Sequence, residues 1–136
     1  MRIVVSDSVC LINLTEACLI EVFLRSPYEL LIPNTMFEDD QMKLTAAQKK
    51  NLLRRGVKVI DLPGERILRA QKVLRRIPQL SVHDGFAFVL AEDYPGCILL
   101  TGDNNLRALA IKESIEVHDF SWAVDEIYRK EQVRSA

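Results

Sequence analysis

The sequence predicts an α/β domain, with three α/β/α layers and a mostly parallel central sheet. Its 136 residues are enough for one hydrophobic core, but few for two. With 49% hydrophobic and 27% charged residues, the chain can bury a core and stay soluble, which excludes disordered and fibrous classes. Short apolar runs also alternate with amphipathic ones. We therefore expect a single domain, residues 1–136, whose parallel strands are joined by helical crossovers.

Five short apolar runs, rich in β-branched residues, have the composition of buried strands. We place these strands at residues 2–6, 30–32, 57–62, 97–101 and 115–118.

Seven segments between these runs have helical character, and we place them at residues 15–24, 33–40, 45–55, 65–77, 82–92, 104–112 and 120–131. Residues typical of helix boundaries stand at several of their ends. Pro33 suits a first helical position, Thr45 suits an N-cap and Gly56 suits the position after a helix. Pro78 follows a helix that must end there.

Apolar runs in this chain are all shorter than the ~20 residues that cross a bilayer, and the apolar start is too short for a signal peptide. We therefore expect a cytoplasmic protein without a membrane segment. The three cysteines, Cys10, Cys18 and Cys97, form no CxxC pair and have apolar neighbours, so we expect buried thiols.

Acidic residues follow several of the predicted strands and helix starts. Asp7 comes directly after the strand at 2–6, and Asp103 follows the strand at 97–101, so both are expected at the same edge of the sheet. Glu38 and Asp84 lie on helices that can lean over this edge. Ligands of open α/β sheets bind in the crevice beyond the carboxyl ends of the strands. Four carboxylates crowded there would repel one another unless a cation neutralised them, and oxygen ligands select Mg²⁺ or Mn²⁺.

Each acid also has a purely structural explanation. Asp7 and Asp103 suit helix N-caps, and Asp84 stands three residues after Ser81, as in a capping box. Glu38 belongs to an acidic run that is typical of solvated helix surface. Only the combination of the four acids favours a metal site over these separate roles.

Four segments carrying these acids resemble the motifs of the PIN domain family: IVVSDSVCLINL, LLIPNTMFED, SVHDGFAFVLAE and LLTGDNNLRALA. The similarity spans nearly the whole chain and implies a PIN-like, Rossmann-like fold. It also implies that Asp7, Glu38, Asp84 and Asp103 are catalytic and hold one or two Mg²⁺ or Mn²⁺ ions, with Thr101 supporting the site by hydrogen bonding. Acidic residues at 39 and 40 leave open which of these positions supplies the second ligand.

Members of this family include metal-dependent ribonucleases that act as toxins of toxin–antitoxin modules. The resemblance therefore implies hydrolysis of RNA phosphodiester bonds, together with a cognate antitoxin protein and a homodimer as partners.

Residues 43–76 are strongly basic, since they hold eleven of the eighteen Lys and Arg but only two acids. Arg66, Arg69, Lys72 and Arg76 recur at spacings of three and four, which aligns them on one side of a helix. Such a surface favours contact with RNA phosphates, which would hold the backbone without reading bases. An acidic protein partner or an ordinary solvated face would produce the same pattern.

Three alternatives belong to other functional classes. A receiver-like phosphoacceptor needs adjacent acids after the first strand, but Ser8 follows Asp7, and residues 115–119 lack the lysine expected after the last strand. A dehalogenase-like phosphatase needs an acid at Val9. A PIN-like domain that binds RNA or a partner without cutting is the closest alternative, and the presence of all four acids speaks against it.

Overall fold

The computed structural model describes residues 2–25 and 27–135, with side chains as far as Arg129. Its centre is a five-stranded sheet made of β1 (Arg2–Ser6), β2 (Tyr28–Pro33), β3 (Lys58–Ile60), β4 (Ile98–Leu100) and β5 (Glu116–His118). The strand order is β3-β2-β1-β4-β5, and every neighbouring pair is parallel. The predicted three-layer α/β/α fold with a parallel sheet is confirmed, and all five strands overlap the predicted runs.

The strand order creates a switch point between β1 and β4. The chain moves outward from β1 to β2 and β3, then returns to place β4 and β5 on the other side of β1. Crossovers on the two sides of such a point lie on opposite faces of the sheet, which leaves a crevice at the carboxyl ends of the two strands. Asp7 and Asp103 follow these two strands.

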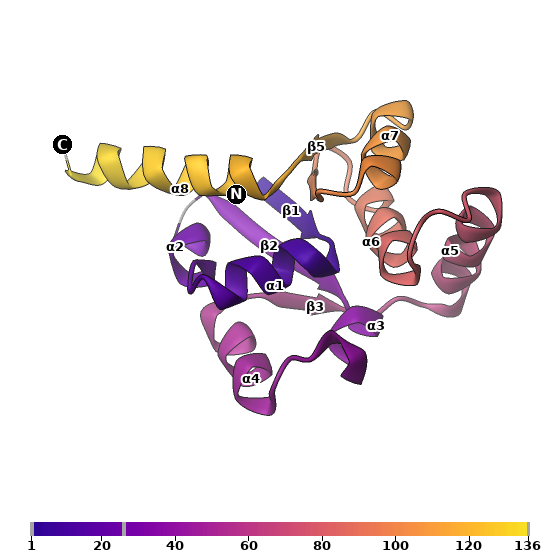
Figure 1. The fold of residues 1–136 in the computed structure, drawn as a ribbon, viewed down its shortest axis with the longest axis horizontal. Coiled ribbons are helices and arrows are strands. Elements are labelled where there is room, and N and C mark those ends of the chain that lie inside the picture. The colour runs from indigo at the N-terminus through magenta and orange to yellow at the C-terminus, as the bar shows by residue number, and fades with distance from the viewer. Residues whose placement is uncertain (1, 26, 136) are drawn as a thin grey trace.

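Eight helices surround this sheet in the described part of the chain. They are α1 (Ser8–Glu16), α2 (Ile20–Leu24), α3 (Asn34–Phe37), α4 (Ala46–Arg55), α5 (Gly64–Arg76), α6 (Val82–Glu92), α7 (Asn104–Lys112) and α8 (Phe120–Ser135), with a 3₁₀ turn at Asp40–Met42. Figure 1 shows α5, α6 and α7 gathered on one side of the molecule, and α1, α2 and α4 on the other. None of the described helices is long and apolar enough to cross a membrane.

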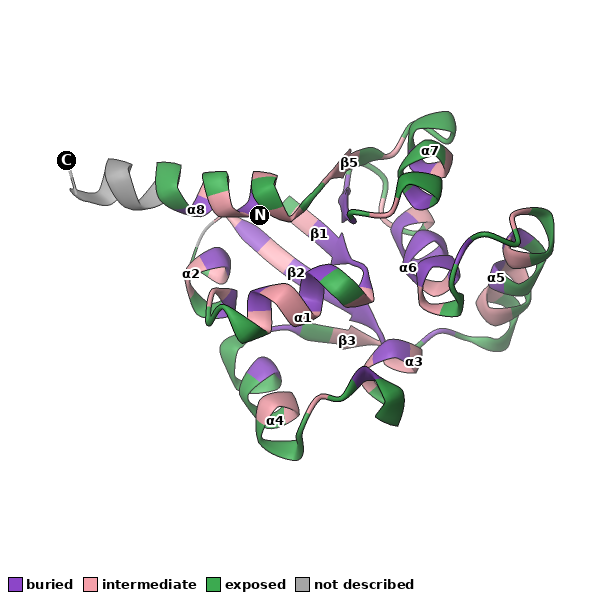
Figure 2. Cartoon of the chain, viewed as in Figure 1, coloured by how far each residue is buried: buried purple, intermediate pink, exposed green. Residues whose placement is uncertain are grey.

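Helix α6 is the central helix of its layer. It packs against β1, β2 and β4 and against α5, and an unbroken run in its C-terminal half, residues 87–91, is buried (Figure 2). A Cβ added at Gly85 would lie 3.0 Å from the Leu74 side chain. This glycine therefore allows the close approach of α5 to α6.

The predicted helix at 15–24 is wrong in its bounds. Two helices, α1 and α2, occupy this region because the chain turns at Cys18, which has a left-handed φ of 57°. Cys18 is also exposed, so only Cys10 and Cys97 are the buried thiols expected.

The predicted helix at 33–40 is shorter than expected. The prediction of Pro33 as its first residue is wrong, because Pro33 belongs to β2 and is the N-cap of α3, and α3 already ends at Phe37. Other boundary predictions are confirmed. Thr45 caps α4 through a capping box with Gln48, and Gly56 ends that helix with a φ of 105°.

Candidate metal centre

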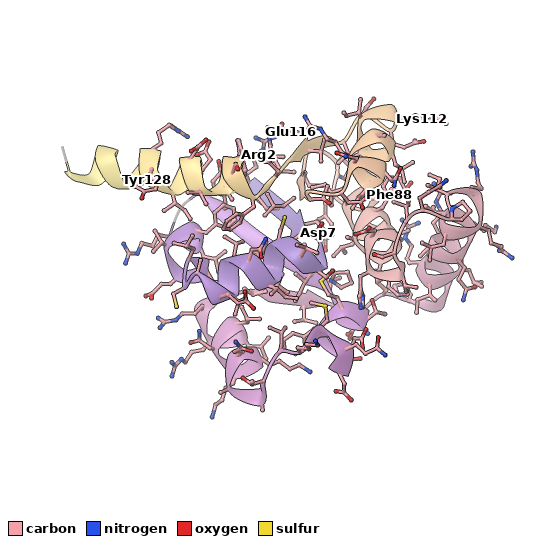
Figure 3. The ribbon with its side chains drawn as sticks, viewed as in Figure 1. Arg2, Asp7, Phe88, Lys112, Glu116 and Tyr128 are labelled. Atoms are coloured by element: carbon pink, nitrogen blue, oxygen red, sulfur yellow. The ribbon has the colours of Figure 1, made fainter. Side chains whose placement is uncertain are left out.

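Asp7 leaves the end of β1 and immediately caps α1 (Figure 3). Its Oδ1 accepts a hydrogen bond from the backbone N–H of Cys10 at 2.8 Å, and its Oδ2 accepts one from the Thr101 hydroxyl at 2.5 Å. Only 2% of the residue is exposed. The N-cap expected for Asp7 is confirmed, and the positive end of the α1 dipole favours a negative charge there.

Thr101 joins the ends of the two central strands. It is 1% exposed, and its hydroxyl donates to Asp7 while accepting the backbone N–H of Asp103 at 3.0 Å. Asp103 in turn caps α7, because its Oδ1 accepts the Leu106 N–H at 2.8 Å. Two acids far apart in the sequence are thereby held in one network at the switch point.

Asp84 approaches from α6, where it forms the expected capping box with Ser81. The Asp84 N–H donates to the Ser81 hydroxyl at 3.1 Å, and the Ser81 N–H donates to Asp84 Oδ2 at 3.4 Å. Burial raises the pKa of the Asp84 carboxyl, and the negative charges of Asp103 and Asp7 raise it further, whereas the bonds from Ser81 lower it. The Asp84 carboxyl therefore lies close enough to Asp103 and Asp7 to be affected by their charges.

Glu38 lies at the end of α3 and is exposed, with no side-chain hydrogen bond or ion pair inside the described part of the chain. Its neighbour Asp39 is placed differently. Asp39 Oδ2 lies 2.7 Å from Nε2 of His83, the residue that precedes Asp84. The bond from the Gln41 N–H and the contact with His83 lower the pKa of Asp39. This contact cannot be predicted from one sequence, because it depends on how the segment after α3 packs against the start of α6.

Hard oxygen donors at one edge of the sheet suit Mg²⁺ or Mn²⁺. Among the side chains described, no three Asp, Glu, His or Cys residues form a group that could enclose a metal ion directly. Mg²⁺ commonly keeps several waters and binds proteins through one or two carboxylates, so this spacing fits a hydrated ion. Burial is the largest cause of the raised pKa of Asp84, and a cation would offset both this cost and the added effect of the Asp103 and Asp7 charges.

Cys10 lies beside Asp7 without the properties of a nucleophile. Burial raises the pKa of its thiol far above the usual range, and the neighbouring Asp7 carboxylate adds to the effect. The thiol therefore stays protonated at neutral pH.

The four basic residues predicted on one side of a helix lie on α5 and have two different environments. Arg66 donates to the Val89 carbonyl at 3.0 Å and pairs with Glu92 at 3.1 Å, and Arg69 pairs with Glu92 at 3.0 Å. Both arginines are thereby engaged at the C-terminal end of α6. Lys72 and Arg76 are exposed, so they remain the better placed of the predicted phosphate contacts.

Comparison with known proteins identifies the family of this chain. A sequence model described as PIN domain matches residues 3–135, which is nearly the whole chain. No curated protein matches it. The parallel sheet with its switch point between β1 and β4 agrees with this match, and the match indicates a nuclease-type fold. The chain belongs to the PIN domain family.

Proposed function

We propose that this protein is a metal-dependent endoribonuclease that hydrolyses RNA phosphodiester bonds. The observation that carries the proposal is the network of Asp7, Thr101 and Asp103, with Asp84 within reach of its negative charge. If these acids only capped helices, nothing would require three of them, from three different elements, to lie at one crevice. The PIN domain match favours nuclease chemistry for the same residues.

In this proposal Asp7, Asp84 and Asp103 hold Mg²⁺ or Mn²⁺, and Thr101 keeps Asp7 in position. A divalent ion at this place would activate a water molecule and neutralise charge on the scissile phosphate. Both oxygens of Asp7 already accept hydrogen bonds, whereas one oxygen each of Asp84 and Asp103 has no protein donor in the described part of the chain. These two acids therefore have the more available ligand atoms.

We assign the fourth acidic position to Asp39 in preference to Glu38. Asp39 is held against the start of α6 through His83, whereas Glu38 points into solvent from the end of a short helix. In this proposal His83 is a positioning residue that holds the Asp39 carboxylate through the 2.7 Å contact. An Asp39→Asn variant should lose metal affinity, and Glu38→Gln should keep it.

The direct test is cleavage of a labelled RNA by the purified protein after EDTA treatment and after return of Mg²⁺ or Mn²⁺. Cleavage should need the ion and should disappear in Asp84→Asn and Asp103→Asn. A folded wild-type protein that cuts no RNA with either ion would contradict the proposal and would favour a PIN domain that binds RNA or a protein partner without cutting.

A more specific form of this proposal is that the ribonuclease is the toxin of a toxin–antitoxin module, with a cognate antitoxin and a second copy of the chain as partners. It predicts that expression of the wild-type chain arrests bacterial growth, whereas expression of Asp84→Asn does not. Equal growth with both proteins would separate the nuclease activity from a toxin role.

A further inference from the structure

A groove of about 350 Å³ lies between α5 and α7, with α6 beneath it. Val73, Phe88 and Leu109 give it an apolar floor, and Arg76, Asn105 and Lys112 add polar groups at its rim. Figure 3 shows Phe88 on α6 and Lys112 at the end of α7, on the same side of the molecule. The volume is at the lower end of the roughly 300–1,000 Å³ found for small-ligand sites.

One end of the groove is level with the elements that carry Asp84 and Asp103, although neither acid lines it. Helices α5 and α6 are antiparallel, since Arg66 contacts Glu92 whereas Leu74 lies against Gly85. Arg76 is therefore level with the start of α6, where Asp84 lies. On the opposite wall, Asn105 is two residues from Asp103. The groove then follows α7 to Lys112, a distance of about 10 Å at 1.5 Å per residue.

The basic residues on the groove walls differ in whether an acidic side chain lies close to them. Glu92 neutralises Arg69, and Glu113, which also lines the groove, lies near the same arginine. Arg76 and Lys112 are both exposed and have no carboxylate partner within the described part of the chain. A ligand that fits this arrangement carries negative charge at two points, one toward each end of the groove, and a flat apolar group between them.

We propose that this groove binds a nucleotide of the RNA strand next to the one that is cut. The two phosphodiester groups on either side of this nucleotide lie at Arg76 and Lys112, and its base packs on the apolar floor at Leu109. The inference rests on the proposed ribonuclease activity and adds a binding site to it. An acidic protein segment would share the charge but would not need the apolar floor beside the acids, so RNA is the occupant we assign.

The test measures binding of a short fluorescein-labelled single-stranded RNA to the full chain in EDTA, by fluorescence anisotropy over a range of salt concentrations. In R76A/K112A the affinity should fall at least about tenfold, and the slope of log affinity against log salt should fall by about 1.4, since each phosphate contact on a single strand contributes ~0.7. The Ala108→Trp variant, which fills the groove from an exposed position, should also weaken binding at least about tenfold.

The matched control is K50A/R54A, which removes one lysine and one arginine from exposed positions on α4. Its affinity should stay within about twofold of the wild type. If R76A/K112A and Ala108→Trp bind RNA as the wild type does, the groove is not the nucleotide site, whether or not the wild type still cuts RNA. If the wild type binds the RNA but never cuts it with Mg²⁺ or Mn²⁺, the ribonuclease proposal fails. The RNA affinities of the variants alone then decide whether the groove binds a nucleotide.

Discussion

Replacing Thr101 with valine removes one hydroxyl from the centre of the acidic network and keeps the branched shape of the side chain. Asp7 would lose the 2.5 Å bond to its Oδ2, and the N–H of Asp103 would lose its 3.0 Å acceptor. A hydrogen bond to a charged group contributes about 1.5–3 kcal/mol, and an ordinary one about 1. Because the site is almost fully buried, we expect Thr101→Val to destabilise the protein by about 3 kcal/mol.

At roughly 2.1 cal/mol/K per residue, unfolding of the 136-residue chain has an entropy of about 0.3 kcal/mol/K. The loss therefore corresponds to a fall in Tm of about 10 °C, measured by thermal unfolding followed by circular dichroism. Thr101→Ser is the control, because it keeps the hydroxyl and loses one methyl group, at about 1 kcal/mol. If valine proves no worse than serine, packing and not hydrogen bonding holds this residue, and the network does not position Asp7.

Three further predictions follow from the site and its surroundings. Folding raises the pKa of Asp84, so the stability linked to its protonated form is present below the pKa of the unfolded chain and is lost as the pH rises through the folded-state value. Without metal, Asp84→Asn should therefore be more stable than the wild type at pH 7 in urea unfolding curves, and the difference in stability should vanish at acid pH. A variant that is less stable than the wild type at pH 7 would contradict this. Glu92→Gln removes the carboxylate shared by two arginines of α5 and should cost about 1 kcal/mol, allowing for its partial exposure, in the same assay; an unchanged midpoint would show that these pairs contribute nothing. Asp39→Asn should weaken Mn²⁺ binding in calorimetry, whereas Glu38→Gln should not, and the reverse result would restore Glu38 as the ligand.

Much of the fold was predictable because local patterns and the global arrangement agree. The β-branched runs lie in a parallel sheet, and Thr45 and Gly56 bound α4 as their residue types predict. The helix break at Cys18 could not be predicted, since it depends on a left-handed residue that is neither glycine nor asparagine.

The site was partly predictable for the same reason. Acids that follow the strands of a parallel sheet lie at the same edge of it, which placed Asp7 and Asp103 near each other. The contact of Asp39 with His83 and the pairing of Arg66 with Glu92 depend on how separate elements pack, and one sequence carries no signal for them.

The structure also changes which variant best probes the chemistry. Asp7 is buried and accepts two hydrogen bonds, so its replacement affects folding as well as any bound ion. Asp84→Asn keeps an acceptor for the Ser81 N–H and removes only the charge. Loss of activity in that variant therefore reports on the site and not on the stability of the domain.

The most direct test of the account is a titration of the metal-free protein with Mn²⁺, followed by isothermal titration calorimetry and by the rise in Tm. We predict that the wild type binds Mn²⁺ and gains stability, because the ion relieves the repulsion among the acids. Asp84→Asn and Asp103→Asn should remain folded and lose both effects. Wild-type protein that neither binds the ion nor gains stability, or variants that respond as the wild type does, would contradict the assignment of this crevice as a metal centre.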